Sequence, residues 1–326
     1  MLKIGTRSSA MARAQTTDVI AALAAAATPV AGEAVFFKPR GDRDQTGKLD
    51  AHGGKGGAFV AEIRAAMRDG ALQAAMHSLK DVPGDEETPG LVLGAYIERE
   101  PPEDVLVLRG DIALDHFLET KGAGLKIGTN AVRRAAYLRR LFPEADVIHF
   151  RGAADTRLKK LDERTPQRLP DGSSVGPADA LVMARSGLDR IGRADRIDHI
   201  FTVDDMLPAV GQGVVVVECA ETDFETRRTL LAIDHHATRH CALAERELLW
   251  VLNGHCNSPI AGHATIDGDI MRLRAAVLSL DGAHIIEADG AGPADRPREL
   301  GRAVGLNLIA KGAAALIEAS APVLSS

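Results

Sequence analysis

Residues 2–9 read LKIGTRSS, a short apolar strand followed by a polar turn that leads into a helix. Ser8 or Ser9 can cap that helix, because a hydroxyl at a helix start accepts a hydrogen bond from a free backbone N–H group. The apolar positions Val19 and Leu23 belong to the face that this helix buries. A strand that leads directly into an amphipathic helix is the repeating unit of α/β folds.

The same alternation of strand and helix continues along the chain. We expect strands at 34–37, 71–76, 91–97, 125–128, 147–150, 180–184 and 214–218, and helices at 59–67, 132–141 and 156–161. Parallel sheets are expected in both of the alternating segments. Beyond residue 235 the pattern predicts a helix at 242–252, three strands at about 262–267, 271–280 and 284–289, and one long helix at about 297–318.

The composition indicates a soluble globular protein with two or three domains, since the 326 residues are 45% hydrophobic and 26% charged. The net charge of −6 argues against general affinity for nucleic acid. Arg outnumbers Lys by 29 to 10. Arg binds carboxylates and phosphates through two parallel hydrogen bonds, so this excess weakly favours a small anionic ligand. A GC-rich genome would enrich Arg in the same way.

The three cysteines, Cys219, Cys241 and Cys256, form no CxxC pair. This pattern argues against a zinc site or a disulfide framework and favours a reducing cytoplasm. The N-terminus has no apolar signal core, and no apolar stretch reaches the roughly twenty residues of a membrane span. We therefore expect a cytoplasmic protein that does not interact with membranes.

Charged side chains follow several of the expected strands, at the sheet edge where parallel sheets bind ligands. Asp81 follows the buried run at 71–76, within the stretch HSLKDVP, and is the residue for which a chemical role is most expected. The other strand ends carry cationic groups. Three of them have a hydroxyl side chain nearby, Arg7 with Ser9, Lys80 with Ser78, and Arg133 and Arg134 with Thr129, and the fourth has two arginines, Arg151 and Arg157. Together they indicate a substrate with several carboxylates or phosphates. Each arginine taken alone is equally compatible with a surface ion pair.

Two loops add candidate residues. The stretch GGKGG at 53–57 lacks the spacing of a phosphate-binding loop, so we interpret it as a lid that carries Lys55, or else as a plain linker. Cys256 lies on a small polar loop after a helix, where a thiol is accessible and can be reactive, whereas Cys219 and Cys241 are expected to pack in the interior. Three histidines, His235, His236 and His240, are interpreted as a helix start, and no metal site is expected.

These stretches, in this order, resemble the hydroxymethylbilane synthase (porphobilinogen deaminase) family from end to end. The matching segments are IGTRSS at 4–9, RGD at 40–42, GGKG at 53–56, HSLKDVP at 77–83, GT at 128–129 with RR at 133–134, FRG at 150–152 with TRL at 156–158, LPAVGQG at 207–213 and NGHCNSPIAG at 253–262. Several of these segments are specific to the family.

The resemblance implies an α/β fold with three domains. The first two are periplasmic-binding-protein-like (type II) with a cleft between them, and the third is a small α+β domain with a three-stranded sheet. The implied limits are 1–98 with about 208–232 for the first domain, 99–207 for the second and 233–326 for the third. The lid and Asp81 fall in the first domain, most of the arginines in the second and Cys256 in the third.

The resemblance also implies a reaction, in which four porphobilinogen molecules are joined head to tail into hydroxymethylbilane with loss of ammonia. It implies a dipyrromethane cofactor held by a thioether to Cys256 and by Lys80, Asp81, Arg133 and Arg134, with Asp81 as the catalytic acid and base. The implied substrate-binding residues are Arg7, Ser9, Lys55, Ser78, Lys80, Thr129, Arg133, Arg134, Arg151, Arg157 and Arg190. A monomer that passes its product to uroporphyrinogen-III synthase is implied as well, without a metal or a nucleotide.

The chain departs from the family pattern at several positions. Asn130 and Ala131 replace two serines, Ala153 replaces an asparagine, His255 replaces a glycine, and the stretch 163–176 is longer than usual. These changes leave open a diverged homologue with reduced or no polymerising activity. The fold alone is also compatible with a solute-binding protein that captures an anion, although such a protein would be expected to carry an export signal. Only the exposed stretch 163–176 suggests a role in protein interaction.

Overall fold

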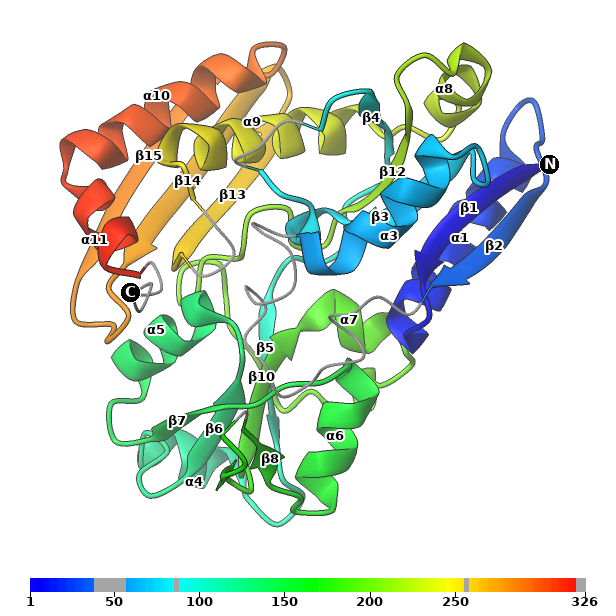
Figure 1. The fold of residues 1–326 in the computed structure, drawn as a ribbon. Helices are drawn as coiled ribbons and strands as arrows, with labels where there is room; N and C mark the ends of the chain where they lie inside the picture. Colours follow the sequence, from blue (N-terminus) through cyan, green and yellow to red (C-terminus); the bar gives the residue numbers. More distant parts are fainter. Residues whose placement is uncertain (38–56, 85–87, 170, 255–257, 321–326) are drawn as a thin grey trace.

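The computed structural model describes residues 1–37, 57–84, 88–169, 171–254 and 258–320. They form three bodies, two α/β lobes and a smaller third domain, and each is built on its own main sheet (Figure 1). The fold class expected from the sequence is therefore confirmed. The exact limits of the three domains stay a prediction.

The first lobe contains a five-stranded sheet in the order β2-β1-β3-β12-β4. Its strands are β1 (Leu2–Arg7), β2 (Gly32–Phe37), β3 (Ala74–Ser78), β4 (Leu91–Tyr96) and β12 (Val215–Ala220), and its helices are α1 (Ala10–Ala25), α3 (Gly57–Arg68) and α8 (Phe224–Leu231). Successive residues of β3 point to opposite faces, so Met76 packs in the core beneath α1 and Ala75 packs with Ile63 of α3. The strand that leads to Asp81 is thus covered on both sides.

The second lobe has a sheet in the order β11-β5-β10-β6-β7. Its strands are β5 (Asp104–Leu108), β6 (Lys126–Thr129), β7 (Asp146–His149), β10 (Ala180–Ala184) and β11 (His199–Ile200), and its helices are α4 (Leu114–Glu119), α5 (Val132–Leu141), α6 (Ala154–Asp162) and α7 (Arg185–Arg190). The alternating residues Leu106 and Val107 belong to two separate buried clusters, one on each face of this sheet. The expected helix at 132–141 is confirmed at both ends.

The two lobes share one topology. Among the parallel strands of each sheet, the first along the chain lies between the second and the third: β1 between β2 and β3, and β6 between β7 and β10. These first strands, β1 and β6, share the sequence KIGT. In each sheet the third strand, β3 or β10, is followed by one antiparallel strand, β12 or β5. That antiparallel strand comes from the chain that has just left the other lobe. The exchange of strands links the lobes through two connectors, at 97–103 and 201–214.

The third domain consists of α9 (His236–Leu252), the antiparallel strands β13 (Ile260–Asp267), β14 (Ile270–Leu278) and β15 (Ile285–Pro293), and the helices α10 (Pro297–Ala310) and α11 (Ala313–Ser320). Both α9 and α10 lie over one face of the sheet (Figure 1). The expectation of one long last helix was wrong. The helix breaks at Lys311 and Gly312, where Gly312 has a φ of +96°, and the two parts meet at 85°.

No single helix in the described parts of the chain has the length and hydropathy needed to cross a membrane. The bent pair α10 and α11 reaches these limits only when its two helices are counted together. Leu308 of α10 and Ala313 of α11 are fully buried in the core of the third domain.

A buried carboxylate joins the three bodies. Glu245 on α9 has no exposed surface and accepts hydrogen bonds from the Arg99 side chain, from the backbone N–H of Gly211 at 2.7 Å and from that of Ala264 at 2.8 Å. Arg99 lies in the first connector and Gly211 in the second. Arg99 Nε also donates to the carbonyl of Gln212 at 2.9 Å. Both connectors are therefore fixed to each other and to the third domain at one point.

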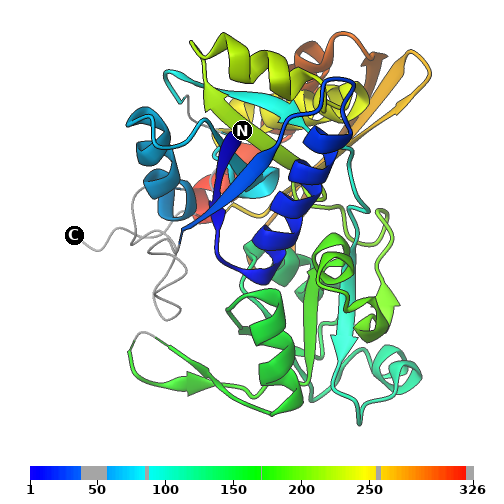
Figure 2. The same ribbon diagram turned by 90° about the vertical axis from the view of Figure 1, so that its right-hand side faces the viewer.

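The lobes also touch directly, where α1 of the first approaches α7 of the second (Figure 2). The stretch 163–176, expected as an exposed insertion, forms a short hairpin of β8 (Gln167–Arg168) and β9 (Ser174–Val175). Most of its residues are exposed, but Gln167 is buried.

Candidate active site

Asp81 ends a single 3-10 turn, η2 (Leu79–Asp81), that follows β3 directly. The turn closes through a hydrogen bond from the N–H of Val82 to the carbonyl of Leu79 at 3.0 Å. Leu79 is buried and packs closely against Gly211. A Cβ atom added to Gly211 would lie only 2.8 Å from the Leu79 side chain. The Asp81 side chain, by contrast, keeps 31% of its surface exposed. The fold thus fixes the backbone of Asp81 and leaves its carboxylate accessible.

The predicted residues at the ends of β1 and β3 come together around Asp81. Arg7 Nη1 lies 3.5 Å from the carboxylate of Asp81. Ser9 caps α1 by accepting from the N–H of Ala12 at 3.3 Å, as expected for this position. Ser78 Oγ lies 3.0 Å from Nε2 of Gln15, a residue of α1 that the sequence did not suggest. These side chains line one small pocket, with Thr6, Arg7, Ser9, Gln15, His77, Ser78 and Asp81 among its walls.

Lys80 is half-buried in the same turn, and its surroundings perturb its protonation. Burial lowers the pKa of Lys80 to about 8, and the positive charge of Arg134 adds to this effect, whereas Asp81 opposes it. Arg134 belongs to the second lobe. Lys80 therefore lies close enough to the arginines of the second lobe for their charge to act on it.

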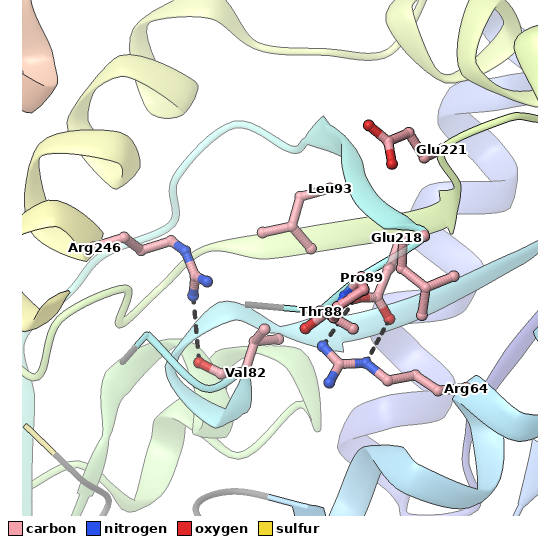
Figure 3. A pocket seen from close by; sticks show the side chains of 10 residues that line it. Arg64, Val82, Thr88, Pro89, Leu93, Glu218, Glu221 and Arg246 are labelled. Carbon is pink, nitrogen blue, oxygen red and sulfur yellow. Dashed lines mark hydrogen bonds and ion pairs between the residues drawn. The ribbon is translucent and has the colours of Figure 1, made fainter. Parts of the chain in front are cut away.

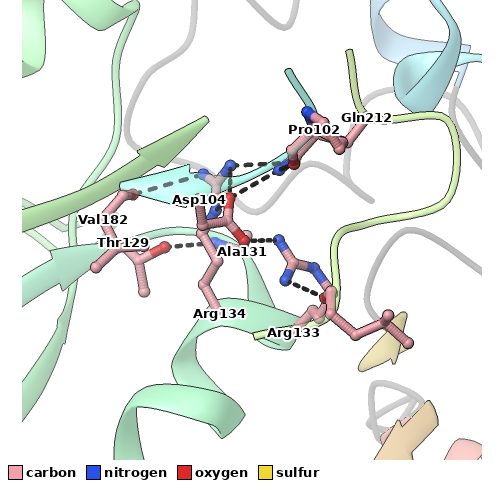
Figure 4. A network of polar contacts seen from close by, with 9 residues as sticks. Pro102, Asp104, Thr129, Ala131, Arg133, Arg134, Val182 and Gln212 are labelled. Carbon is pink, nitrogen blue, oxygen red and sulfur yellow. Dashed lines mark hydrogen bonds and ion pairs between the residues drawn. The ribbon is translucent and has the colours of Figure 1, made fainter. Parts of the chain in front are cut away.

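Two buried arginines at the start of α5 are held by one carboxylate (Figure 4). Asp104, the first residue of β5, has no exposed surface and receives Arg133 Nη2 at 2.5 Å and Arg134 Nε at 2.9 Å. Burial alone would raise the pKa of Asp104, but the two guanidinium groups more than offset it and hold the pKa below its ordinary value. Each arginine also donates to a further acceptor, Arg133 to the carbonyl of Leu207 at 2.8 Å and Arg134 to Oε1 of Gln212 at 3.3 Å.

Gln212 connects this network to the second connector. Its Nε2 donates to Asp104 at 2.9 Å and to the carbonyl of Pro102 at 2.6 Å. Asp104 and Gln212 were both missed by sequence reasoning. A signal existed for Asp104, since it is a charged residue directly before the fully apolar run 105–108. Gln212 gave no such signal, because its position between two glycines is equally typical of a surface turn.

The other arginines of the second lobe differ in their surroundings. Arg157 on α6 has two side-chain nitrogens, Nε and Nη1, that are buried and lack a hydrogen-bond partner among the described residues. Burial, with a contribution from Arg134, lowers the pKa of Arg157 to about 10. Arg151 is 6% exposed and follows β7. A buried cation without an acceptor is costly, so the surroundings of Arg157 favour an anionic ligand.

Arg190 and Thr129 lie apart from this pattern. Arg190 Nε is 2.8 Å from Glu100 in the first connector and 4.0 Å from Asp18 on α1, so it bridges the two lobes. Its predicted role in substrate binding stays a prediction. Thr129 is buried at the end of β6, where its hydroxyl accepts from the N–H of Ala131 at 3.3 Å.

Two predicted residues, Lys55 and Cys256, lie outside the described residues.

The departures from the family pattern can be located in part. Ala131 and Ala153 stand at the N-termini of α5 and α6, and neither helix has a side-chain cap. His235 caps α9, as expected for a helix start, by accepting from the N–H of Thr238 at 3.3 Å. No group of His, Cys, Asp and Glu side chains in the described segments is arranged to hold a metal ion.

Behind β3, on the side of α3, a buried ionic group supports the site (Figure 3). Glu218 on β12 receives both Nε and Nη2 of Arg64 at 2.9 Å, and Nε2 of His77 lies 3.4 Å away. Burial would raise the pKa of Glu218, but the nearby His77 and the hydrogen bonds from Arg64 lower it to about 2. Arg64 and Glu218 also line a pocket of 330 Å³ whose opposite wall includes Arg246.

The arrangement as a whole presents one accessible carboxylate among several cations from two lobes. Cations spaced in this way can bind a ligand that carries several carboxylates. A carboxylate fixed among them can accept or donate a proton and can stabilise a positive charge that develops on the ligand.

Comparison with known proteins identifies the family. Residues 2–228 match the family model described as porphobilinogen deaminase, dipyromethane cofactor binding domain, and residues 239–310 match the porphobilinogen deaminase C-terminal domain. Porphobilinogen deaminase 2 of Streptomyces coelicolor is 38% identical over 98% of this chain and 96% of its own. Porphobilinogen deaminase of Geobacter metallireducens is 37% identical over 96% of this chain and 92% of its own.

Among solved structures, the methionine binding protein MetQ aligns with 71% of this chain and 89% of its own, at 12% identity and a TM-score of 0.41. The two family models and the full-length relatives together cover both lobes and the third domain. The chain therefore belongs to the porphobilinogen deaminase family.

Proposed function

We propose that this chain joins porphobilinogen units into hydroxymethylbilane at the site around Asp81, and that Cys256 carries its dipyrromethane cofactor. Hydroxymethylbilane synthesis is the activity of its family, so the chain is a transferase of tetrapyrrole biosynthesis. The single observation that carries the assignment of the site is the meeting of Asp81 and Arg7, 3.5 Å apart, at one small pocket of the first lobe.

The residues of the site fit a dipyrromethane. This group bears acetate and propionate side chains, and Arg157 offers two buried N–H groups that have no acceptor among the described residues. We propose that Lys80, Asp81, Arg133 and Arg134 hold the group, in addition to its thioether to Cys256. The chemistry that a bound dipyrromethane supplies is a nucleophilic pyrrole carbon, at which extension begins.

The protein's own residues would then act on porphobilinogen in distinct ways. Arg7, Arg151 and Arg157, with Lys55, Ser9, Ser78, Thr129 and Arg190 in support, bind its two carboxylates and orient the ring. When the bond between the aminomethyl carbon and nitrogen breaks and ammonia leaves, positive charge develops on the pyrrole. The carboxylate of Asp81 stabilises that charge and accepts a hydrogen bond from the pyrrole N–H. It also takes up the proton that is lost when the new carbon–carbon bond forms.

Lys80 provides a pH-dependent test of this assignment. Since burial lowers the pKa of Lys80 to about 8, the free enzyme loses this ammonium as the pH rises through that value. We expect kcat/KM for porphobilinogen to fall above about pH 8, because this parameter reports on the free enzyme. The Lys80→Arg variant keeps its charge and should keep kcat/KM up to higher pH. An identical alkaline decline in both proteins would assign it to another group.

The attachment of the cofactor can be tested by the intact mass of the purified protein, beside a Cys256→Ser variant. We expect the wild type to carry a covalent excess equal to two pyrrole units and the variant to run at its plain sequence mass. Cys219→Ser is the matched control, since that thiol is buried in β12 and should not affect the excess. A wild type without excess mass, after expression in a haem-making host, contradicts the role of Cys256.

A diverged homologue with little polymerising activity is the second candidate, favoured by the uncapped N-termini at Ala131 and Ala153. Complementation of a bacterial strain that lacks the synthase separates the two, because only an efficient enzyme restores growth. We also propose that the protein is a cytoplasmic monomer and that it passes its product to uroporphyrinogen-III synthase. The resemblance to the family supports these last points.

A further inference from the structure

The hairpin β8–β9 contributes one buried side chain to the interior of the second lobe. Gln167 is 2% exposed, whereas its neighbour Arg168 and the facing Ser174 are exposed. The hairpin lies against α6 and β7, because Val175 packs on the cluster that contains Ile148. A buried polar side chain on an otherwise exposed hairpin is retained only where its hydrogen bonds are satisfied.

The amide of Gln167 is satisfied on both sides, since its Nε2 donates to the carbonyl of Arg168 at 2.8 Å. Its Oε1 accepts from the N–H of Arg151 at 3.0 Å and from Nζ of Lys160 at 3.1 Å. Lys160 Nζ in turn donates to the carbonyl of Arg151 at 3.1 Å. The three groups form a closed ring, in which both the N–H and the C=O of Arg151 are bonded to side chains from other elements. We call these two residues, Gln167 and Lys160, the Arg151 brace.

The two residues that follow Arg151 do little to hold the loop in shape. Gly152 adopts a φ of +132°. Glycine adopts this conformation readily, but it has no side chain that would hold the backbone there. Ala153, at the N-terminus of α6, has no side chain that could cap the helix and close the turn. On the other side, Phe150 is fully buried, and its ring lies 5.7 Å from Nζ of Lys160. The brace therefore connects the loop to α6 and to the hairpin.

We propose that Gln167 and Lys160 are positioning residues, which fix the backbone of Arg151 so that its guanidinium is directed at a carboxylate of the growing tetrapyrrole. This proposal rests on the proposed function, since it assumes that Arg151 binds substrate. It gives the stretch 163–176 a role in the active site of the second lobe. Neither brace residue touches the substrate in this assignment.

The contacts predict how different substitutions at Gln167 behave. Glutamate loses the donor to the Arg168 carbonyl but keeps an oxygen acceptor for the Arg151 N–H and adds a negative charge beside Lys160, so Gln167→Glu keeps the brace. Leucine has a similar size but no acceptor, so Gln167→Leu releases the Arg151 N–H. Asparagine keeps the chemistry but is one methylene shorter, so Gln167→Asn cannot reach both donors. Ser174→Ala, on the exposed facing strand, is the matched control.

The experiment measures KM and kcat for porphobilinogen in these five proteins, wild type included, together with hydrogen–deuterium exchange at the Arg151 amide. In Gln167→Leu and Gln167→Asn we expect faster exchange at Arg151 and a rise in KM of about tenfold, the factor that loss of one hydrogen bond to a charged ligand typically gives. The value of kcat should change less than twofold, because the loss affects binding of substrate and transition state alike. Gln167→Glu and Ser174→Ala should match the wild type.

Each contrary outcome has a distinct meaning. Unchanged exchange in Gln167→Leu and Gln167→Asn overturns the brace itself. Faster exchange with an unchanged KM overturns its role in positioning. If Gln167→Leu does not fold, Gln167→Asn, which keeps a polar amide, decides the question. A wild type that releases no ammonia from porphobilinogen refutes the proposed function. An active wild type with an equally active Gln167→Leu leaves the proposed function intact and overturns only the positioning role of Gln167.

Discussion

Asp81→Asn lowers kcat for porphobilinogen by about a thousandfold if Asp81 is the catalytic acid and base, the size of effect that loss of such a group typically has. Asparagine has nearly the same shape but neither carries a charge nor exchanges a proton. Among the described residues, the interaction that the substitution removes is the ion pair with Arg7, at 3.5 Å and partly exposed. The thermal midpoint should therefore change little, because such pairs contribute little to stability.

Two controls make this test specific. Asp69→Asn, at the exposed end of α3, removes a carboxylate from the same lobe outside the site and should leave kcat unchanged. The intact mass of Asp81→Asn shows whether the variant carries its cofactor, which separates a lost catalytic step from a failure of assembly. A variant that carries the cofactor and keeps more than a tenth of wild-type kcat would show that Asp81 is not the acid and base.

Of the substitutions proposed for this protein, Arg64→Met should cause the largest loss of folding stability. Arg64 is buried and gives two hydrogen bonds of 2.9 Å to Glu218, itself 2% exposed. Without Arg64, the partner that Glu218 keeps among the described residues is His77, and a buried charge that has lost its main partner costs about 3–5 kcal/mol. We expect the free energy of unfolding, measured with urea, to fall by about this amount. Arg68→Met, at the exposed end of the same helix, is the control and should change it by less than about 0.5 kcal/mol.

The same group predicts a sensitivity to acid. The pKa of Glu218 is about 2 in the folded protein and has an ordinary value of 4.5, so its ionised form stabilises the fold above about pH 4.5. This contribution is lost as the pH falls from about 4.5 towards 2. The double variant Arg64→Met/Glu218→Met should be more stable than Arg64→Met alone and less sensitive to acid. Equal stability of the single variant and the Arg68→Met control would show that the pair contributes nothing.

The side chains gathered around Asp81 could be predicted from the sequence because their position depends on where parallel strands end. Arg7 and Ser78 end β1 and β3, which are neighbours in the sheet, and Asp81 follows β3, so their approach was expected. The residues that hold these side chains in place could not be predicted in the same way. Gln15, Gln212 and Gln167 are buried amides whose partners come from distant elements, 63 residues away for Gln15 and Ser78. A polar residue in a helix, a turn or an insertion looks exposed until the fold supplies its partner.

The last helix shows a second limit of reasoning from periodicity. Apolar residues such as Ile309, Ala313 and Leu316 keep a spacing of three or four residues across the break between α10 and α11. The break depends on Gly312, whose left-handed conformation ends one helix and turns the chain by 85°. A glycine inside a periodic segment is compatible both with one continuous helix and with two helices separated by a bend. Packing of α11 against β14 selects the bend.

The exchange of strands between the lobes sets the order in which the protein can be completed on the ribosome. All five strands of the second lobe lie between residues 104 and 200, so its sheet can close as soon as this contiguous stretch has emerged. The first lobe, although synthesised earlier, has a gap between β3 and β4 until β12 arrives with residues 215–220. Its strand edges stay unpaired in the meantime and are open to wrong partners. The nascent chain can therefore complete the sheet of the second lobe before that of the first. The strand β3, which leads to Asp81, is among the last to gain both of its neighbours in the sheet.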